Sequence, residues 1–164
     1  QSEALTMSNR IAVFNDGVVQ QLSTPDILYE KPENSFVAEF IGENNTMTGT
    51  IKNINQDHCE VEIDGGGKVK ALKINVGEVG SKTKLSVRPE RVSLNSANNE
   101  EFNNFNGQVK ELIYLGDHIR ARLAVCGSEE FIVKIPNEGN FDLKESASIA
   151  VSWDYTDIRA LDYS

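Results

Sequence analysis

Two stretches of the chain resemble each other and decide its fold: Leu-Ser-Val-Arg-Pro-Glu-Arg-Val at residues 85–92 and Ile-Ala-Val-Ser-Trp-Asp-Tyr-Thr at residues 149–156. A second pair lies upstream in the same order, with Gly-Thr-Ile-Lys-Asn-Ile at residues 49–54 and Gly-Gln-Val-Lys-Glu-Leu at residues 107–112. The two offsets are 64 and 58 residues, and a loop insertion accounts for the difference. Ordered internal similarity of this kind indicates a repeated structural unit.

The residues around these stretches show the period of half-buried strands. Apolar and acidic side chains alternate over residues 59–64, three glycines follow at residues 65–67, and Lys68 and Lys70 then face the acidic row across a hairpin. Each copy supplies about five strands, the number in an oligonucleotide/oligosaccharide-binding (OB) barrel. We therefore predict a mainly β fold of two tandem, intertwined OB-like small barrels, with halves at about 46–95 and 106–164. Residues 96–106 are rich in asparagine and are expected to form a solvated loop.

The first 45 residues have a different pattern. Residues 10–14 and 18–22 are short apolar strands joined by Asn-Asp-Gly, a sequence typical of a tight hairpin turn. Thr24 is expected to be the N-cap of a short helix that Pro32 ends. A second helix is expected over residues 35–41, with Phe36, Val37, Phe40 and Ile41 on one face and Gly42 as its stop.

The same opening segment carries a specific resemblance. Glu-Ala-Leu-Thr-Met-Ser-Asn-Arg-Ile-Ala-Val at residues 3–13, Gly-Val-Val-Gln-Gln-Leu-Ser-Thr-Pro-Asp-Ile-Leu-Tyr-Glu-Lys-Pro at 17–32 and Phe-Val-Ala-Glu-Phe-Ile-Gly at 36–42 follow one another almost without interruption. Together they resemble the end of the nucleotide-binding domain of an ABC importer ATPase and the linker to its regulatory domain. Glu-Asn-Asn at residues 43–45 is more similar to polyamine-type importers than to sugar-type ones.

Segments of the second half extend the resemblance over almost the whole chain. Leu-Ser-Val-Arg-Pro-Glu at residues 85–90, Tyr-Leu-Gly-Asp at 114–117 and the closing stretch 153–162 are similar to the TOBE (transport-associated OB) regulatory domain of these ATPases. The resemblance implies that residues 1–45 are the remnant of the nucleotide-binding domain with its linker helices. It implies that residues 46–164 are the regulatory domain.

The resemblance also implies a biological setting. The parent is then the ATP-hydrolysing subunit of an ABC importer for spermidine or putrescine, which uses ATP and Mg. Such subunits form homodimers and contact membrane permease subunits, so the expected location is cytoplasmic, on the inner face of the cell membrane. No apolar run of the chain approaches the ~20 residues that span a bilayer.

Catalytic motifs are missing from this sequence. An ATPase needs Gly-x-x-x-x-Gly-Lys-Ser/Thr to hold phosphates, whereas Gly67-Lys68 is followed by Val69 and position 62 is glutamate. His58, Cys59, His118 and Cys126 fit no common zinc spacing. We therefore expect neither catalytic residues, nor a cofactor site, nor a metal site in this chain.

Five residues are candidate regulatory or dimer contacts: Arg88, Glu90, Tyr114, Gly116 and Asp117. Arg88 and Glu90 are open to two interpretations, a local ion pair on a bent strand or a contact between the barrel and a neighbour or small ligand. Tyr114 is either an aromatic at the edge of the core or a subunit contact. Trp153 is expected to be core.

Two other functions compete with the regulatory one. A small-ligand sensor for an oxyanion or sugar is open, although no cluster of positive groups stands out in the sequence. A nucleic-acid-binding OB protein is disfavoured, because such a surface needs positive charge and stacking aromatics, and the chain has a net charge of −9 and 7% aromatic residues.

The opening segment also predicts self-association. In the intact subunit, residues 10–22 are expected to pack on the nucleotide-binding domain and to bury Ile11, Val13 and Val19. Exposed apolar strands favour pairing with another chain. We therefore predict self-association of this chain through residues 3–22.

Overall fold

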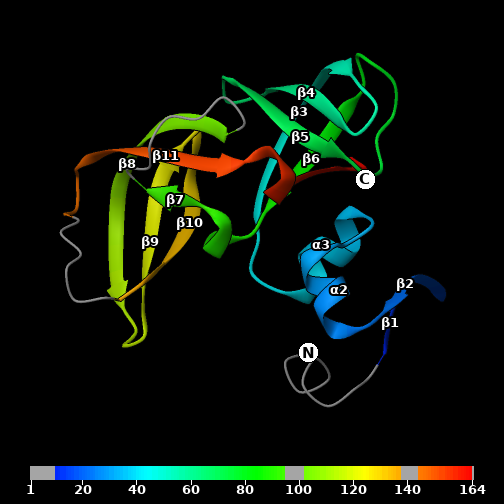
Figure 1. The fold of residues 1–164 in the computed structure, drawn as a ribbon, viewed down its shortest axis with the longest axis horizontal. Helices are drawn as coiled ribbons and strands as arrows, with labels where there is room; N and C mark the ends of the chain where they lie inside the picture. The colour runs from blue at the N-terminus through cyan, green and yellow to red at the C-terminus, as the bar shows by residue number, and fades with distance from the viewer. Residues whose placement is uncertain (1–9, 95–101, 138–143, 164) are drawn as a thin grey trace.

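A computed structural model describes residues 10–94, 102–137 and 144–163 of the chain. Figure 1 shows a small hairpin, two short helices and two five-stranded β units, with the helices between the hairpin and the upper β unit. The mainly β fold is as predicted from the sequence. Among the described residues, no helix has the length and apolar character needed to cross a membrane.

The hairpin consists of β1 (Ile11–Asn15) and β2 (Val18–Ser23), which pair antiparallel. Its turn residues Asp16 and Gly17 both have positive φ, at 52° and 75°, as the Asp-Gly sequence predicts. Val13 faces the helices and is 2% exposed, and its cross-strand partner Gln21 is 4% exposed. The opposite face is open to solvent.

The two helices are α2 (Pro25–Glu30) and α3 (Ser35–Ile41), as predicted. Thr24 occupies the N-cap position of α2, but its hydroxyl donates to Asp26 instead of capping the backbone. Asn34 caps α3, because its side chain accepts from the Val37 amide at 2.9 Å. The predicted apolar face of α3 is wrong for Phe40. This side chain is 43% exposed and stacks on Phe36.

The first β unit is a closed barrel with the strand order β12-β5-β4-β3-β6. Its strands are β3 (Asn45–Ile54), β4 (His58–Ile63), β5 (Lys68–Lys73), β6 (Lys82–Val87) and β12 (Ile158–Leu161). Glu60 lies opposite Lys70, and Glu62 opposite Lys68, so the predicted cross-strand charge pairing has the predicted register.

The second unit is an open five-stranded sheet in the order β10-β9-β8-β11-β7. Its strands are β7 (Ser93–Leu94), β8 (Phe102–Tyr114), β9 (His118–Val125), β10 (Ser128–Pro136) and β11 (Ser148–Asp154). The expected second barrel is thus a half-barrel in the described structure. Strand β7 has only two residues and offers little ladder for closure.

The two units exchange their last strands, which makes them intertwined as predicted. Strand β7 follows the short 3₁₀ helix η1 (Pro89–Arg91) and pairs with β11 of the second unit. Strand β12 follows η2 (Tyr155–Asp157) and pairs with β6 of the first unit. The pair Leu94–Val151 in one contact matches Ile158–Val87 in the other, each member displaced by 64 residues.

Smaller details follow the repeat as well. A register shift occurs between Ile51 and Asn53 in β3 and again between Val109 and Glu111 in β8, 58 residues later. Gly49 and Gly107 occupy equivalent positions in which an added Cβ would lie 2.5 Å from the Glu62 oxygen and 2.8 Å from Val125, respectively. Close packing therefore requires glycine at this position inside β3 and inside β8.

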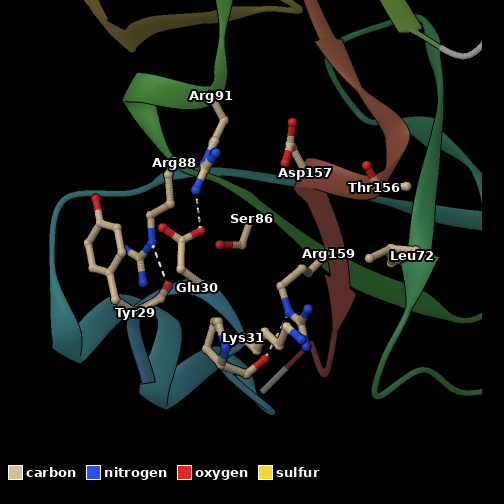
Figure 2. A pocket seen from close by; sticks show the side chains of 11 residues that line it. Tyr29, Glu30, Lys31, Leu72, Ser86, Arg88, Arg91, Thr156, Asp157 and Arg159 are labelled. Atoms are coloured by element: carbon tan, nitrogen blue, oxygen red, sulfur yellow. Dashed lines mark hydrogen bonds and ion pairs between the residues drawn. The ribbon is translucent and has the colours of Figure 1, made fainter. Parts of the chain in front are cut away.

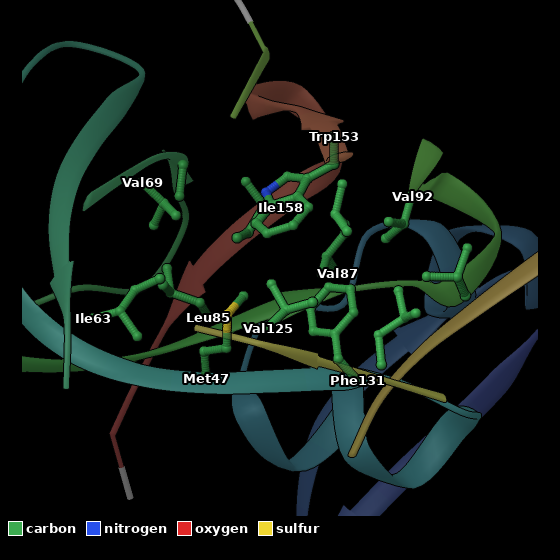
Figure 3. Packing of buried hydrophobic residues seen from close by; sticks show 14 of the residues in the cluster. Met47, Ile63, Val69, Leu85, Val87, Val92, Val125, Phe131, Trp153 and Ile158 are labelled. Atoms are coloured by element: carbon green, nitrogen blue, oxygen red, sulfur yellow. The ribbon is translucent and has the colours of Figure 1, made fainter. Parts of the chain in front are cut away.

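One apolar core joins the two units. Leu85, Val87 and Ile158 from the barrel meet Phe131 and Trp153 from the sheet in a single cluster (Figure 3). Trp153 is fully buried, as predicted, and stacks on Phe105 and Phe131 with ring centroids 5.2 and 5.5 Å apart. Because the units share this core, they form one packed body.

The loop predicted over residues 96–106 is wrong for its last part. Residues 102–106 begin β8 and pair with β11, whereas residues 95–101 lie outside the described structure. Asn103 explains the error, since it is 8% exposed, and its side chain accepts from the Lys70 amide and donates to the Lys70 carbonyl, each at 2.9 Å. Asparagine side chains are usually solvated. This one instead forms hydrogen bonds with the backbone of the other β unit, in place of strand-to-strand bonds.

Candidate functional site at the linker joint

Arg88 connects the linker helices to the closed barrel. It follows β6 directly, is 5% exposed and donates from Nε to the Tyr29 carbonyl at 3.3 Å and from Nη1 to the Glu43 carbonyl at 2.9 Å. Its guanidinium also lies 4.4 Å from the centre of the Tyr29 ring. Burial lowers the pKa of Arg88 from its ordinary value, and Tyr29 opposes that shift.

Glu90, two residues later, contacts the same tyrosine. The Tyr29 hydroxyl donates a hydrogen bond to the Glu90 carboxylate. Burial, and then this hydrogen bond, raise the pKa of Tyr29 well above its usual range. Among the described residues no ion pair links Arg88 to Glu90, because each contacts a different part of Tyr29. Helix α2 therefore lies between the two residues that the sequence paired.

Glu43 joins the end of α3 to the open sheet. Its carboxylate pairs with Arg120 of β9 and, at 3.2 Å, with Lys134 of β10. The hydrogen bond from Arg120, with help from Lys134, holds the pKa of Glu43 below its ordinary value. We call Tyr29, Glu43, Arg88, Arg120 and Lys134 the joint, because they connect the linker to both β units.

Two further pairs reinforce the joint. The Asn45 side chain donates to the Ile132 carbonyl at 2.7 Å and accepts from the Ile132 amide at 2.8 Å. At the other end of α3, the Ser35 amide donates to Asp162 at 2.8 Å. The first pair thus joins β3 of the barrel to β10 of the sheet, and the second joins α3 to the segment after β12. These groups are buried or half-buried, and such bonds stabilise more than exposed ones.

The remaining predicted contacts, Tyr114, Gly116 and Asp117, lie at the hairpin between β8 and β9. Tyr114 is 63% exposed, so it is not a core-edge residue. Gly116 has a φ of 86°, which favours glycine, and the Asp117 carboxylate pairs with His118 at 2.8 Å. This hairpin tip, residues 113–117, also exposes Ile113 and Leu115.

A cavity of about 430 Å³ brings Asp117 of the tip together with Glu90, Tyr29 and Lys134. Two of the predicted residues therefore share one site, while Arg88 lines a different cavity on the other side of Tyr29. The sequence reasoning missed Tyr29, Glu43, Arg120 and Lys134. Their spacing in the sequence gives no indication that they meet, because they lie in four separate segments of the chain.

Both cysteines are free thiols, Cys59 buried and Cys126 half-buried. Burial raises the pKa of both Cys59 and Cys126 to about 11, so both thiols stay protonated at neutral pH. Within residues 10–94, 102–137 and 144–163, no group of three metal-ligating side chains occurs.

Comparison with known proteins identifies a family for part of the β region. Residues 85–161 match a family described as the TOBE domain. The chain carries a TOBE domain. The cytoplasmic molybdate-binding protein ModG, solved with molybdate bound, has a similar fold: the TM-score is 0.61 at 20% identity, over 72% of this chain and 95% of that one.

Proteins named spermidine/putrescine import ATP-binding protein PotA are similar over more than the TOBE domain. The relative from Rubrobacter xylanophilus is 34% identical over 94% of this chain and 41% of its own length. The relatives from Pseudomonas aeruginosa strain UCBPP-PA14 and Nitrosospira multiformis are 36% and 41% identical over 84% and 71% of this chain. The chain spans 38% of the length of the Pseudomonas aeruginosa relative, about two fifths.

Proposed function

We propose that this chain is the linker and regulatory region of the ATP-hydrolysing subunit of an ABC importer for spermidine or putrescine. The observation that carries the proposal is 34% identity, over an alignment that covers 94% of the chain, to a protein named as a spermidine/putrescine import ATP-binding protein. At that coverage the similarity includes the linker as well as the TOBE domain. ATP and Mg are bound by the parent's nucleotide-binding domain.

The geometry supports a regulatory role through the joint. A movement of the nucleotide-binding domain shifts α2 and α3, and these helices hold both β units through Arg88 and Glu43. Since the two units share one core, they follow the linker as a body. In the reverse direction, a contact made by the TOBE domain changes the position of the linker.

The proposed partners follow from the exposed surfaces. The open face of the hairpin β1–β2, with Phe14 59% and Val18 60% exposed, packs on the nucleotide-binding domain. The hairpin tip at residues 113–117 contacts a second copy of the subunit, with Tyr114 at its centre. The permease is contacted through the nucleotide-binding domain, which places the subunit on the cytoplasmic face of the membrane.

A region exchange tests this function. The segment of the Pseudomonas aeruginosa PotA protein that corresponds to residues 10–163 is replaced by this chain's own residues, and uptake of labelled spermidine is measured in cells that lack the native subunit. We expect the exchange to retain spermidine uptake. A folded hybrid that hydrolyses ATP but imports no polyamine contradicts the proposal. An exchange that leaves out residues 10–45 is the control for the contribution of the linker.

A further inference from the structure

The cavity that Arg88 lines has a volume of about 190 Å³ and lies between the C-terminal end of α2 and the closed barrel. We call it the arginine-lined cavity, because Arg91 and Arg159 line it as well. Figure 2 shows the Glu30 side chain extending from α2 into the space between these arginines. A carboxylate of the linker therefore stands among three guanidinium groups of the β region.

Glu30 pairs with only one of the three arginines in the part of the chain that the structure describes. Its carboxylate lies 2.8 Å from Nη2 of Arg91, and the two side chains are 41% and 44% exposed. Solvent screens an exposed ion pair of this kind, so it contributes little to stability. Arg91 alone therefore does not fix the carboxylate in one place.

The two deeper arginines have unused hydrogen-bond donors. Arg88 is 5% exposed, and its buried Nη2 has no hydrogen-bond partner among the described residues. Arg159 donates from Nε to the Pro32 carbonyl at 3.0 Å and forms no ion pair within residues 10–94, 102–137 and 144–163. Burial lowers the pKa of both guanidinium groups, because it disfavours their charged form. Buried charged donors are normally paired, so the inner side of the cavity offers a second set of donors to a nearby carboxylate.

Glu30 is better placed than the other acidic residue of the lining to use these donors. That residue is Asp157, and burial raises the pKa of its carboxyl, which disfavours its charged form. Asp157 is also the last residue of η2, on the barrel side of the cavity. Glu30 comes instead from the linker and is the last residue of α2. Its position relative to the arginines therefore reports where the linker lies on the barrel.

We propose that Glu30 is a two-position latch, whose carboxylate pairs with Arg91 at the rim and, after rotation of the side chain, with Arg88 and Arg159 inside the cavity. In the inner position two guanidinium groups share one carboxylate, and Nη2 of Arg88 gains an acceptor. The cavity volume of about 190 Å³ is several times the ~30 Å³ share of a water molecule, so a carboxyl group fits. The inner position draws the end of α2 toward β6 and β12, and the rim position releases it.

The consequence for regulation rests on the proposed function. If the linker transmits movement to the TOBE domain, the position of Glu30 sets how firmly the end of α2 is held during that movement. The existence of the two positions is a property of this chain alone, and it is tested without the transporter. Its failure would leave the proposed function standing.

A crystal structure of the Arg91→Gln variant tests the inner position directly. With the rim partner removed, we expect the Glu30 carboxylate within hydrogen-bond distance (~2.7–3.2 Å) of Nη2 of Arg88. A carboxylate that points into solvent overturns the proposal. Arg122→Gln is the control, because Arg122 lies on β9 outside the cavity, and Glu30 should stay on Arg91 in that variant.

Amide hydrogen exchange tests the latch in solution. The Lys31 amide closes the last turn of α2 by donating to the Ile27 carbonyl at 2.7 Å, so its exchange rate reports opening of this turn. Glu30→Gln should speed this exchange by about 5-fold or more, because it removes both positions of the latch. Arg91→Gln should speed it by clearly less, because the inner partners of Glu30 remain.

Glu39→Gln is the matched control for hydrogen exchange, since it removes a half-exposed carboxylate of α3 that pairs with Lys84 outside the cavity. It should leave the exchange of the Lys31 amide unchanged. The amides of β9 should exchange equally in every variant, which shows that the fold is intact. Equal acceleration by Glu30→Gln and Arg91→Gln contradicts a second position, and so does no acceleration by Glu30→Gln.

Discussion

Glu43 is held by two cations from two strands of the open sheet, and its backbone carbonyl accepts from Arg88. One residue thus contacts both β units at the point where the linker ends. The carboxylate is half-buried, so its ion pairs are screened less than exposed ones. Its protonation state therefore affects how firmly the linker is attached.

We expect this carboxylate to contribute to acid sensitivity. Its folded-state pKa lies below the ordinary value of 4.5, so its contribution is present above that pH and is lost as pH falls through the folded pKa. Glu43→Gln should lower the free energy of unfolding near pH 7 by roughly 1 kcal/mol. It should also make that free energy fall less steeply as the pH is lowered. Urea unfolding between pH 3 and 7 (about the carboxyl titration range) measures this.

The control for that experiment is Glu39→Gln, which removes an exposed carboxylate paired with Lys84 at 3.4 Å. It changes net charge by the same amount without touching the joint. If the free energy of unfolding falls as steeply with decreasing pH in Glu43→Gln as in the unchanged protein, the ion pairs of Glu43 have no such role.

At the scale of elements, the exchanged strands β7 and β12 hold the units together unequally. Ile158 of β12 is fully buried in the closed barrel, whereas its repeat equivalent Leu94 in β7 is half-buried. Ile158→Ala should therefore destabilise the chain by about 2–5 kcal/mol. Leu94→Ala should cost roughly 1 kcal/mol. Chemical denaturation compares the two, and equal losses would contradict the structural difference between barrel and half-barrel.

The hairpin β1–β2 belongs to the same scale. Val13 lies on the face toward the helices and is buried there. Phe14, Val19 and Leu22 lie on the opposite face and are exposed. The expected burial of Val19 on a missing domain stays a prediction. We expect concentration-dependent self-association of the chain through this face, measured by sedimentation, and Phe14→Lys should reduce it.

Val79→Lys is the matched control for self-association, since Val79 is 58% exposed and Phe14 59%, yet Val79 lies away from the hairpin. If Phe14→Lys leaves the association unchanged and Tyr114→Lys abolishes it, the contact lies at the hairpin tip. Deleting residues 1–22 would be a less specific test, because Gln21 bonds Lys31 and Glu33 and its loss disturbs the helices.

Sequence patterns predicted the elements well because they depend on local rules. The Asp16-Gly17 turn, the bounds of α3 and the repeat of β6 in β11 follow from φ preference, capping and alternation. The failures are tertiary. Asn103 is in a strand because it bonds Lys70 of the other unit, and Phe40 is exposed because α3 turns its other side to the core.

On the scale of the whole molecule, the joint and the arginine-lined cavity were beyond sequence reasoning for the same cause. Arg88 and Arg159 are 71 positions apart and line the same cavity because β12 pairs with β6. The sequence offered Arg88 and Glu90 as neighbours, whereas the fold places Tyr29 between them. Contacts of this kind can be predicted only after the strand order is known.

The chain by itself should not bind nucleotide. No phosphate-binding loop occurs in its sequence, and Gly67-Lys68 lies in a hairpin turn and strand β5. Calorimetric titration with Mg-ATP is expected to show no saturable site at micromolar concentration. A micromolar site would overturn the assignment of nucleotide binding to the rest of the parent.

We propose that the TOBE domain regulates the parent ATPase through the joint. Arg120 and Arg122 provide a matched pair, because both lie on β9 with side chains 29% exposed, yet only Arg120 contacts Glu43. The most direct measurement is spermidine-stimulated ATP hydrolysis by the full-length subunit assembled with its permease and binding protein. We expect Arg120→Gln to lose most of the stimulation of ATP hydrolysis by spermidine and Arg122→Gln to retain it. Equal stimulation in both variants would contradict it.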